Sequence, residues 1–214
     1  MDLKKATLFV IIGISCKFVL RIFGTLFPGF FRIFFVVQAD QIVSLLAGLA
    51  MVFFFVSFYK DCVQKGEAKL QEASVFAIIG SSAGVLATIK GLFLVFQRYL
   101  SPYLVRYLVT SHSIETILPW VSTLCILYFF VIFYREALHK KWMELKTPAF
   151  LAVVGSFIGV LLSTFVAYHY FRSGEVRWFS EIFRRIPIVF ILLAGFVFIT
   201  LFYFFLSFYK EQQE

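Results

Sequence analysis

Apolar residues fill this chain in long blocks, and most charged residues fall between the blocks or at their ends. A helix that crosses about 30 Å of hydrocarbon needs roughly 20 mainly apolar residues. Six blocks approach or exceed that length: residues 6–24, 41–59, 73–96, 116–134, 148–171 and 187–209. They are too long and too uniformly apolar for barrel strands, and in lipid a helix satisfies its own backbone. The pattern predicts an all-α integral membrane protein with six transmembrane helices.

A nine-residue pattern recurs three times along the chain. The sequences FFFVSFYKD (53–61), YFFVIFYRE (128–136) and YFFLSFYKE (203–211) follow one another at an equal interval, here called the repeat interval. The other spans repeat at the same interval, as AIIGSSAGVL (77–86) and AVVGSFIGVL (152–161) show, while Gly13 precedes Gly80 by a slightly shorter one. Repeats of this kind indicate copies of one supersecondary unit.

We therefore predict three tandem two-helix hairpins, residues 6–60, 73–135 and 148–210, within a single membrane domain (1–214). Polar linkers at 61–72 and 136–147 join them. Each hairpin contains two spans, so all three have the same orientation, and we expect a bundle with approximate three-fold pseudo-symmetry about the membrane normal.

Aromatic residues concentrate in two kinds of segment. The phenylalanine and tyrosine ladders at 53–59, 128–134 and 203–209 suggest lipid-facing bulk that ends in an interfacial anchor. Inside each hairpin, residues 25–40, 97–115 and 171–187 mix arginine with aromatic and aliphatic side chains. We expect short amphipathic segments in the interface there, or simple extensions of the helix ends.

Composition and charge agree with this membrane assignment. Hydrophobic residues make up 61% of the chain and charged residues 15%, against about 45–50% and 25% in soluble domains. The 20 Lys and Arg give a net charge of +8, but most flank apolar blocks, which is typical of membrane proteins and not of nucleic-acid binding. Ten of them lie on the side of the termini and linkers and seven on the other. This excess predicts cytoplasmic termini and location in the cell (inner) membrane.

Two cations interrupt the first span. Lys17 stands eleven residues into it, or about 17 Å at 1.5 Å per residue. A lysine at a helix centre in the membrane costs about 2.5–3.5 kcal/mol, so it is expected to face the bundle interior or a wet cavity. The alternative is that Lys17 and Arg21 snorkel toward the interface.

Glycines mark the same stripe in all three hairpins. Small residues spaced by four allow close approach between membrane helices, so we predict a packing role for this stripe. Its members are Gly13, Gly80, Gly84, Gly155 and Gly159. In the first hairpin, Lys17 and Arg21 continue the stripe at the same spacing, although packing does not require cations there.

Acidic residues offer partners for these cations. Asp40 and Glu115 are separated by the repeat interval and so hold equivalent positions; Arg21 with Asp40 and Lys90 with Glu115 could form one pair per hairpin. The third hairpin has His169 nearby instead. We predict a polar pocket formed by Lys17, Arg21, Asp40, Lys90, Glu115 and His169, with an excess of positive charge that suits an anionic solute or a lipid headgroup.

The sequence offers little support for catalysis or a cofactor. A haem between His112 and His169 is sterically conceivable but only a remote alternative, and we expect no cofactor and no metal. No catalytic motif is found, which disfavours an enzyme, including one acting on lipid. The favoured function is a small transporter-like or solute-binding bundle. The alternative is a non-catalytic accessory or scaffold subunit that holds a membrane-protein partner, further copies of itself or anionic lipids.

Overall fold

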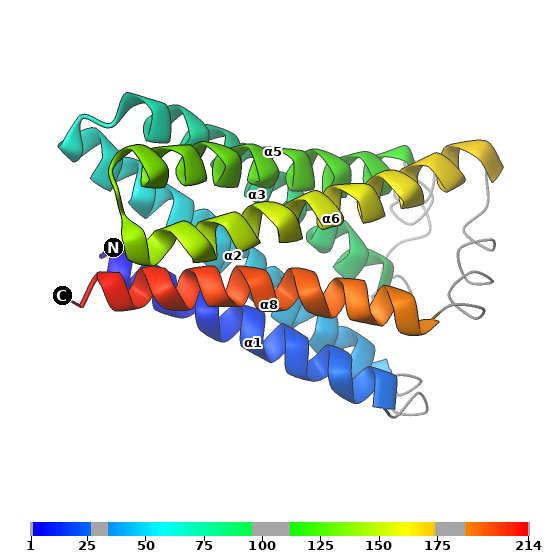
Figure 1. Cartoon of the computed structure of the whole chain (residues 1–214). Helices are drawn as coiled ribbons and strands as arrows, with labels where there is room; N and C mark the ends of the chain where they lie inside the picture. The colour runs from blue at the N-terminus through cyan, green and yellow to red at the C-terminus, as the bar shows by residue number, and fades with distance from the viewer. Residues whose placement is uncertain (1, 27–33, 96–111, 174–186, 214) are drawn as a thin grey trace.

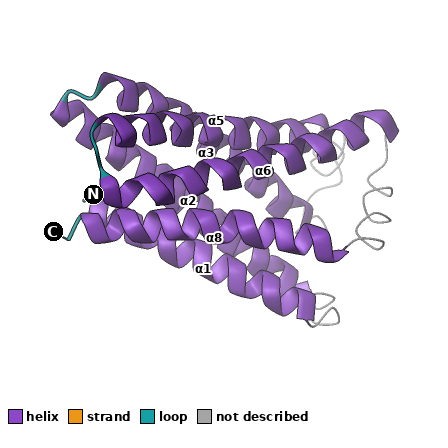
Figure 2. Ribbon diagram, viewed as in Figure 1, coloured by secondary structure: helices purple, strands orange, loops and turns teal. Residues whose placement is uncertain are grey.

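The computed structural model of this chain describes residues 2–26, 34–95, 112–173 and 187–213. Within these ranges all regular secondary structure is α-helical (Figure 2). The helices are α1 (Leu3–Leu26), α2 (Phe34–Lys65), α3 (Ala68–Val95), α5 (His112–His139), α6 (Met143–Ser173) and α8 (Pro187–Glu211). The predicted all-α class is confirmed.

Five of the six described helices, α2, α3, α5, α6 and α8, are long and apolar enough to cross a membrane. This finding supports the prediction of an integral membrane protein. Helix α1 is not among the five; it carries Lys4, Lys5 and Lys17 within its 24 residues.

The helices run back and forth between two ends of an elongated bundle (Figure 1). Their main contacts follow chain order, from α1 on α2 through to α6 on α8, and α8 packs on α1. Both termini lie at the same end of the bundle. We call the half with the termini the proximal half and the other the distal half.

The two polar stretches predicted as linkers, 61–72 and 136–147, are mostly helical. Helix α2 runs to Lys65 and α3 begins at Ala68, so only a tight turn separates them. The Glu67 N–H donates to the Cys62 carbonyl at 3.0 Å and the Gly66 N–H to the Val63 carbonyl at 3.3 Å. This pair of bonds is the Schellman motif that ends helices without a long loop.

The predicted interfacial segments fall largely outside the described residues. This applies to positions 27–33, 96–111 and 174–186. Residues 34–40, 112–115 and 171–173 belong to α2, α5 and α6 respectively.

The aromatic ladders form the interior of the proximal half, which corrects the expectation that they face lipid. Only the first residue of each ladder is classed as exposed, and Phe53, for example, is 53% exposed. Nine phenylalanines, here called the phenylalanine core, are buried: Phe54, Phe55, Phe58, Phe129, Phe130, Phe133, Phe204, Phe205 and Phe208. A closed set of six helices leaves interior space that aromatic rings fill well, because edge-to-face packing is favourable.

Phenylalanines of the three nine-residue sequences make matching contacts in this core. The ring-centroid distances are 4.8 Å for Phe55 with Phe129, 4.9 Å for Phe130 with Phe204 and 5.0 Å for Phe205 with Phe54. A second layer joins Phe58, Phe133 and Phe208 at 5.9, 5.8 and 6.1 Å. Both layers close on themselves, so α2, α5 and α8 meet around one axis.

Candidate functional site

The large, fully buried side chains concentrate in the proximal half. All the largest fully buried side chains, such as Phe130, Leu70 and Val10, lie there. In the distal part of α8, Ala194 is exposed, although it lies seven and fourteen residues before the inward Leu201 and Phe208. Residues seven apart share a helix face.

Two buried charges mark this region on neighbouring helices. Lys90 in α3 and Asp40 in α2 are each only 6% exposed. A Cβ built on Gly91 would lie 3.1 Å from the side-chain oxygen of Gln41, so α3 and α2 are in contact there. Gly91 follows Lys90 in the chain, and Gln41 follows Asp40. The structure thus brings Lys90 and Asp40 to the same level of the bundle.

The carboxylate of Asp40 belongs to the inward stripe of α2. Asp40 precedes the buried Ala47 by seven residues and Phe54 by fourteen, and all three lie on one face. Ala47 contacts α1, since a Cβ on Gly13 would lie 2.9 Å from the Ala47 Cα. Asp40 therefore lies on the side of α2 that packs toward α1.

Lys17 lies slightly deeper in the same region. The Gly13–Ala47 contact and the antiparallel course of α1 and α2 place Lys17 about three residues from Asp40 along the axis, or roughly 4.5 Å. The side chain is partly buried. Lys17, Asp40 and Lys90, three of the predicted binding residues, thus occupy one region of the distal half.

The remaining predicted site residues have side chains outside what the structure describes. This applies to Arg21 in α1, to Glu115 and His112 in α5, and to His169 in α6. The pairs Arg21 with Asp40 and Lys90 with Glu115 therefore stay predictions, as does the remote haem alternative.

The packing glycines differ in their surroundings. Gly13, Gly80 and Gly155 all face a neighbouring helix at close range; a Cβ on Gly80 would lie 2.6 Å from the Cys125 Cβ, and one on Gly155 would overlap Thr200. At Gly84 the nearest atom is the Ser122 hydroxyl at 3.1 Å. At Gly159 a Cβ would meet none of the described atoms within 4 Å.

Sequence reasoning missed a set of hydrogen bonds between α5 and α6. The Trp120 indole N–H donates to the Thr164 hydroxyl at 2.9 Å, and the Thr123 and Ser163 hydroxyls lie 2.9 Å apart. Hydroxyl pairs of this kind hold membrane helices together. The sequence shows hydroxyl residues within otherwise apolar spans, but it does not indicate which residue on the neighbouring helix each one bonds.

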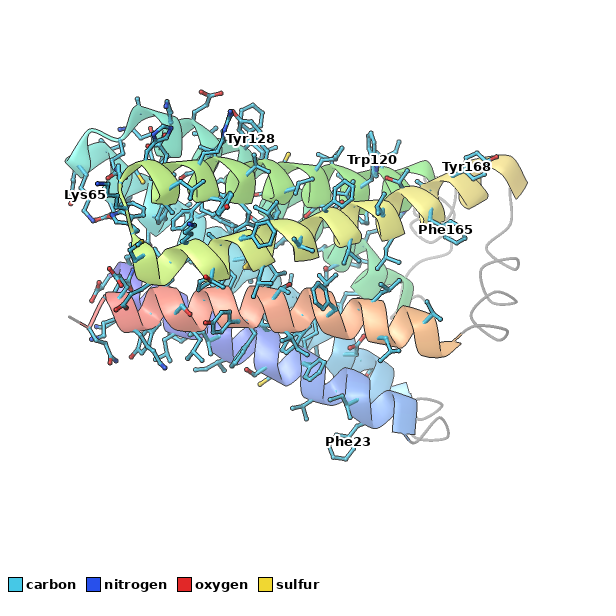
Figure 3. All side chains as sticks on the ribbon, in the orientation of Figure 1. Phe23, Lys65, Trp120, Tyr128, Phe165 and Tyr168 are labelled. Carbon is cyan, nitrogen blue, oxygen red and sulfur yellow. The ribbon has the colours of Figure 1, made fainter. Side chains whose placement is uncertain are left out.

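A cavity of about 500 Å³ lies at the proximal end, beyond Phe58 and Phe208. Its charged lining includes Asp61, Lys65 and Glu67 (Lys65 is labelled at this end in Figure 3). Lys65 pairs with Asp61 at 2.8 Å, and Glu67 pairs with Lys140. The lining has four acidic residues, Asp2, Asp61, Glu67 and Glu211, and two lysines, Lys4 and Lys65. The cavity therefore offers no surplus of positive charge and is a weaker candidate for anion binding than the distal half.

Fold and site together define a helical integral membrane protein with charged residues inside its distal half. In the described part of the chain, no group of three or more His, Cys, Asp or Glu side chains could hold a metal ion. No protein-family model matches the sequence, no curated protein is significantly similar to it, and no solved structure matches it significantly.

Proposed function

We propose that this protein binds an anionic group, carried by a solute or a lipid headgroup, in the distal half of a three-hairpin bundle. The bundle has approximate three-fold pseudo-symmetry, with all six helices in the cell membrane and both termini in the cytoplasm. The burial of Lys90 is the observation that carries the proposal, because a cation inside a membrane bundle is costly and usually functional.

The matching aromatic contacts support the repeat. Three pairs of phenylalanines from successive copies have nearly equal ring distances of 4.8, 4.9 and 5.0 Å. The turn after α5 repeats the turn after α2 as well, since the Trp142 N–H donates to the Ala137 carbonyl at 3.0 Å. Residues at equivalent positions thus have equivalent partners in core and turn.

The charge in the distal half favours an anionic ligand. Among the side chains that the structure describes in this region, Lys17 and Lys90 contribute two positive charges and Asp40 contributes one negative charge. A phosphate or carboxylate between them would neutralise the surplus positive charge. Such an attraction is stronger inside the bundle, away from bulk water, than at a surface.

The phenylalanine core favours a binding site over an open channel. Seven of its nine rings are fully buried and they close the axis of the proximal half. An ion on this axis would have to pass through apolar rings, so transport would require the core to open. Binding in the distal half requires no such change.

Thermal unfolding of the purified protein in mild detergent tests the proposal, with inorganic phosphate and glycerol 3-phosphate as probes. A ligand at about 100 times its Kd stabilises the folded state by about 2.7 kcal/mol, which shifts the unfolding temperature by several degrees. We expect this shift in the wild type, a loss of it in Lys90→Gln and Lys17→Gln, and its retention in Lys90→Arg.

Lys60→Gln is the matched control, because Lys60 is exposed at the proximal end. Circular dichroism and gel filtration establish that each variant is folded. Equal shifts in Lys60→Gln, Lys17→Gln and Lys90→Gln would show that the distal lysines bind nothing. A stoichiometric protein partner that co-purifies without any effect of the probes would favour the scaffold alternative.

A further inference from the structure

The interior of the bundle changes character directly beyond the phenylalanine core. Three rings of that core have no exposed surface: Phe54, Phe129 and Phe204. Seven residues farther toward the distal end, the same faces of α2, α5 and α8 carry three much smaller side chains: Ala47, Ser122 and Val197. Ser122 and Val197 are also only partly buried. The interior at this level is therefore less completely filled than the core.

A buried hydroxyl points into this part of the interior. Ser156 in α6 is 6% exposed, and its Oγ has no hydrogen-bond partner in the part of the chain that the structure describes. Ser156 follows Ala149 by seven residues and Trp142 by fourteen; the first belongs to the buried core and the second packs against it. Residues at this spacing share a helix face, so Ser156 is on the inward face of α6.

The serine at the matching position of the preceding hairpin behaves differently. Ser81 in α3 precedes Ser156 by the repeat interval and is 4% exposed. Its hydroxyl donates to the Ala77 carbonyl of its own helix at 2.7 Å. A buried serine can therefore satisfy its hydroxyl within its own helix in this bundle. Because buried hydroxyls normally have a partner, the unpaired one at Ser156 points to a ligand atom that accepts its hydrogen bond.

Lys17 is on the inward face of α1. It follows Val10 by seven residues and Leu3 by fourteen. Val10 has no exposed surface and belongs to the buried core, and Leu3 packs against that core. The lysine side chain is partly buried. By the same spacing rule, Lys17 continues the inward face of α1 beyond the core, as Ser156 does on α6.

The cation and the hydroxyl lie at the same level of the bundle. Helix α8 packs on both α1 and α6, so contacts along α8 relate the two helices. Phe18 in α1 stacks on Phe198 with ring centroids 3.9 Å apart, and a Cβ on Gly155 in α6 would overlap Thr200, two residues farther toward the proximal end. Helices α1 and α6 run in the same direction (Figure 1). The residue before Phe18, which is the cation, and the residue after Gly155, which is the hydroxyl, are therefore level to within about one turn of helix.

We infer that the ligand is an oxyanion, such as a phosphate group, that lies in the bundle interior directly beyond the phenylalanine core and accepts hydrogen bonds from the Lys17 ammonium and the Ser156 hydroxyl. This inference rests on the proposed function and adds the ligand's chemistry, its position and a further binding residue. The two donors approach from helices on opposite sides of α8, and the separate oxygens of an oxyanion accept from both. Three rings give way to small side chains at this level, so the bound group is larger than a single halide ion.

The test is calorimetric titration of the full chain in maltoside detergent and chloride-free buffer. Inorganic phosphate is one probe and short-chain phosphatidylglycerol is the other, which distinguishes a free solute from a lipid headgroup. Ser156→Ala removes the hydroxyl without adding volume. Ser81→Ala is the matched control, because it removes a buried serine from the equivalent position of α3 whose hydroxyl is already bonded within its helix.

We expect Ser156→Ala to weaken binding of whichever probe binds the wild type by roughly tenfold, as when one hydrogen bond to a charged group is lost. Without a ligand, its unfolding temperature should stay the same or rise, because the substitution removes a buried hydroxyl that lacks a partner. Ser81→Ala should bind the probe like the wild type. An equal concentration of chloride should not displace the probe.

Unchanged binding in Ser156→Ala, together with a loss of binding in Lys17→Gln and Lys90→Gln, would overturn the role of Ser156 and leave the proposed function intact. Displacement of the probe by chloride would show that a single ion occupies the site and would overturn the oxyanion. Binding of neither probe to the wild type would refute the proposed function itself, and this inference with it.

Discussion

Gly66 and Lys141 are separated by the repeat interval of the sequence and share a left-handed backbone, with φ of 69° and 57°. Each lies in the turn after a long helix, where the Schellman motif requires positive φ. Glycine adopts this conformation without strain, whereas a lysine incurs a cost of about 1–2 kcal/mol from the clash of its Cβ. The second turn is therefore built from a less suitable residue than the first.

Lys141→Gly should raise the unfolding temperature of the protein in detergent. Removal of the Cβ relieves the strain, and we expect a gain of up to about 1 kcal/mol because glycine also adds freedom to the unfolded chain. Lys146→Gly, within α6, is the matched control and should lower stability by about 1 kcal/mol. Destabilisation by both substitutions would show that the turn at Lys141 is not strained.

The phenylalanine core should carry a large share of the stability. Phe130→Ala opens a cavity among rings that have no exposed surface, so we expect a loss of about 3 kcal/mol or more. Phe53→Ala removes a side chain from the outer face and should cost less than about 1 kcal/mol. Thermal unfolding of both variants in the same detergent measures the difference. Equal losses of stability would show that the ladders face lipid and do not form the core.

Length and hydropathy were sufficient to predict the helices, because the thickness of hydrocarbon fixes how many apolar residues a span needs. They could not assign Phe53 to lipid and Phe54 to the core. Both environments are apolar in a membrane protein, so no polar alternation distinguishes a buried face from a lipid-facing one. Only the packing of α2 against α5 and α8 separates these two neighbours.

At the candidate site, too, the sequence identifies the residues but not their contacts. Lys17, Asp40 and Lys90 stood out because charge in an apolar block is expensive wherever it points. Gly155 and Gly159 belong to one motif and are indistinguishable by sequence, yet one touches Thr200 and the other faces open space. Whether a glycine is in contact depends on where two helices separate, and that depends on the whole bundle.

This contrast predicts opposite effects of the same substitution four residues apart. Gly155→Ala forces a methyl group into Thr200, a buried side chain that donates to the Val197 carbonyl at 2.9 Å, and should cost about 1–3 kcal/mol. Gly159→Ala meets nothing and improves helix propensity, so it should be neutral or stabilising by up to about 1 kcal/mol. Denaturation in detergent at one protein concentration gives both values. If Gly159→Ala is as harmful as Gly155→Ala, the side of α6 at Gly159 is packed against a neighbour in solution and is not open.

Two ion pairs between the α2–α3 and α5–α6 turns should differ in strength. Lys140 pairs with Glu67, and both side chains are at least two-thirds covered. Lys69 pairs with Glu136 at 3.2 Å, but the lysine is 72% exposed. Water and salt screen most of the attraction between the two charges of an exposed pair.

Double-mutant cycles to methionine should therefore give a coupling of about 1 kcal/mol for Lys140 with Glu67 and about 0.3 kcal/mol for Lys69 with Glu136. The cycle is needed because Lys140 Nζ also lies 4.9 Å from the Trp142 ring centroid, and the lysine substitution removes that contact too. Its loss is the same with or without Glu67, so it cancels from the coupling. Salt should reduce the coupling at Lys69 more than at Lys140. Equal couplings, or equal salt dependence, would show that burial at the turns does not strengthen the pair.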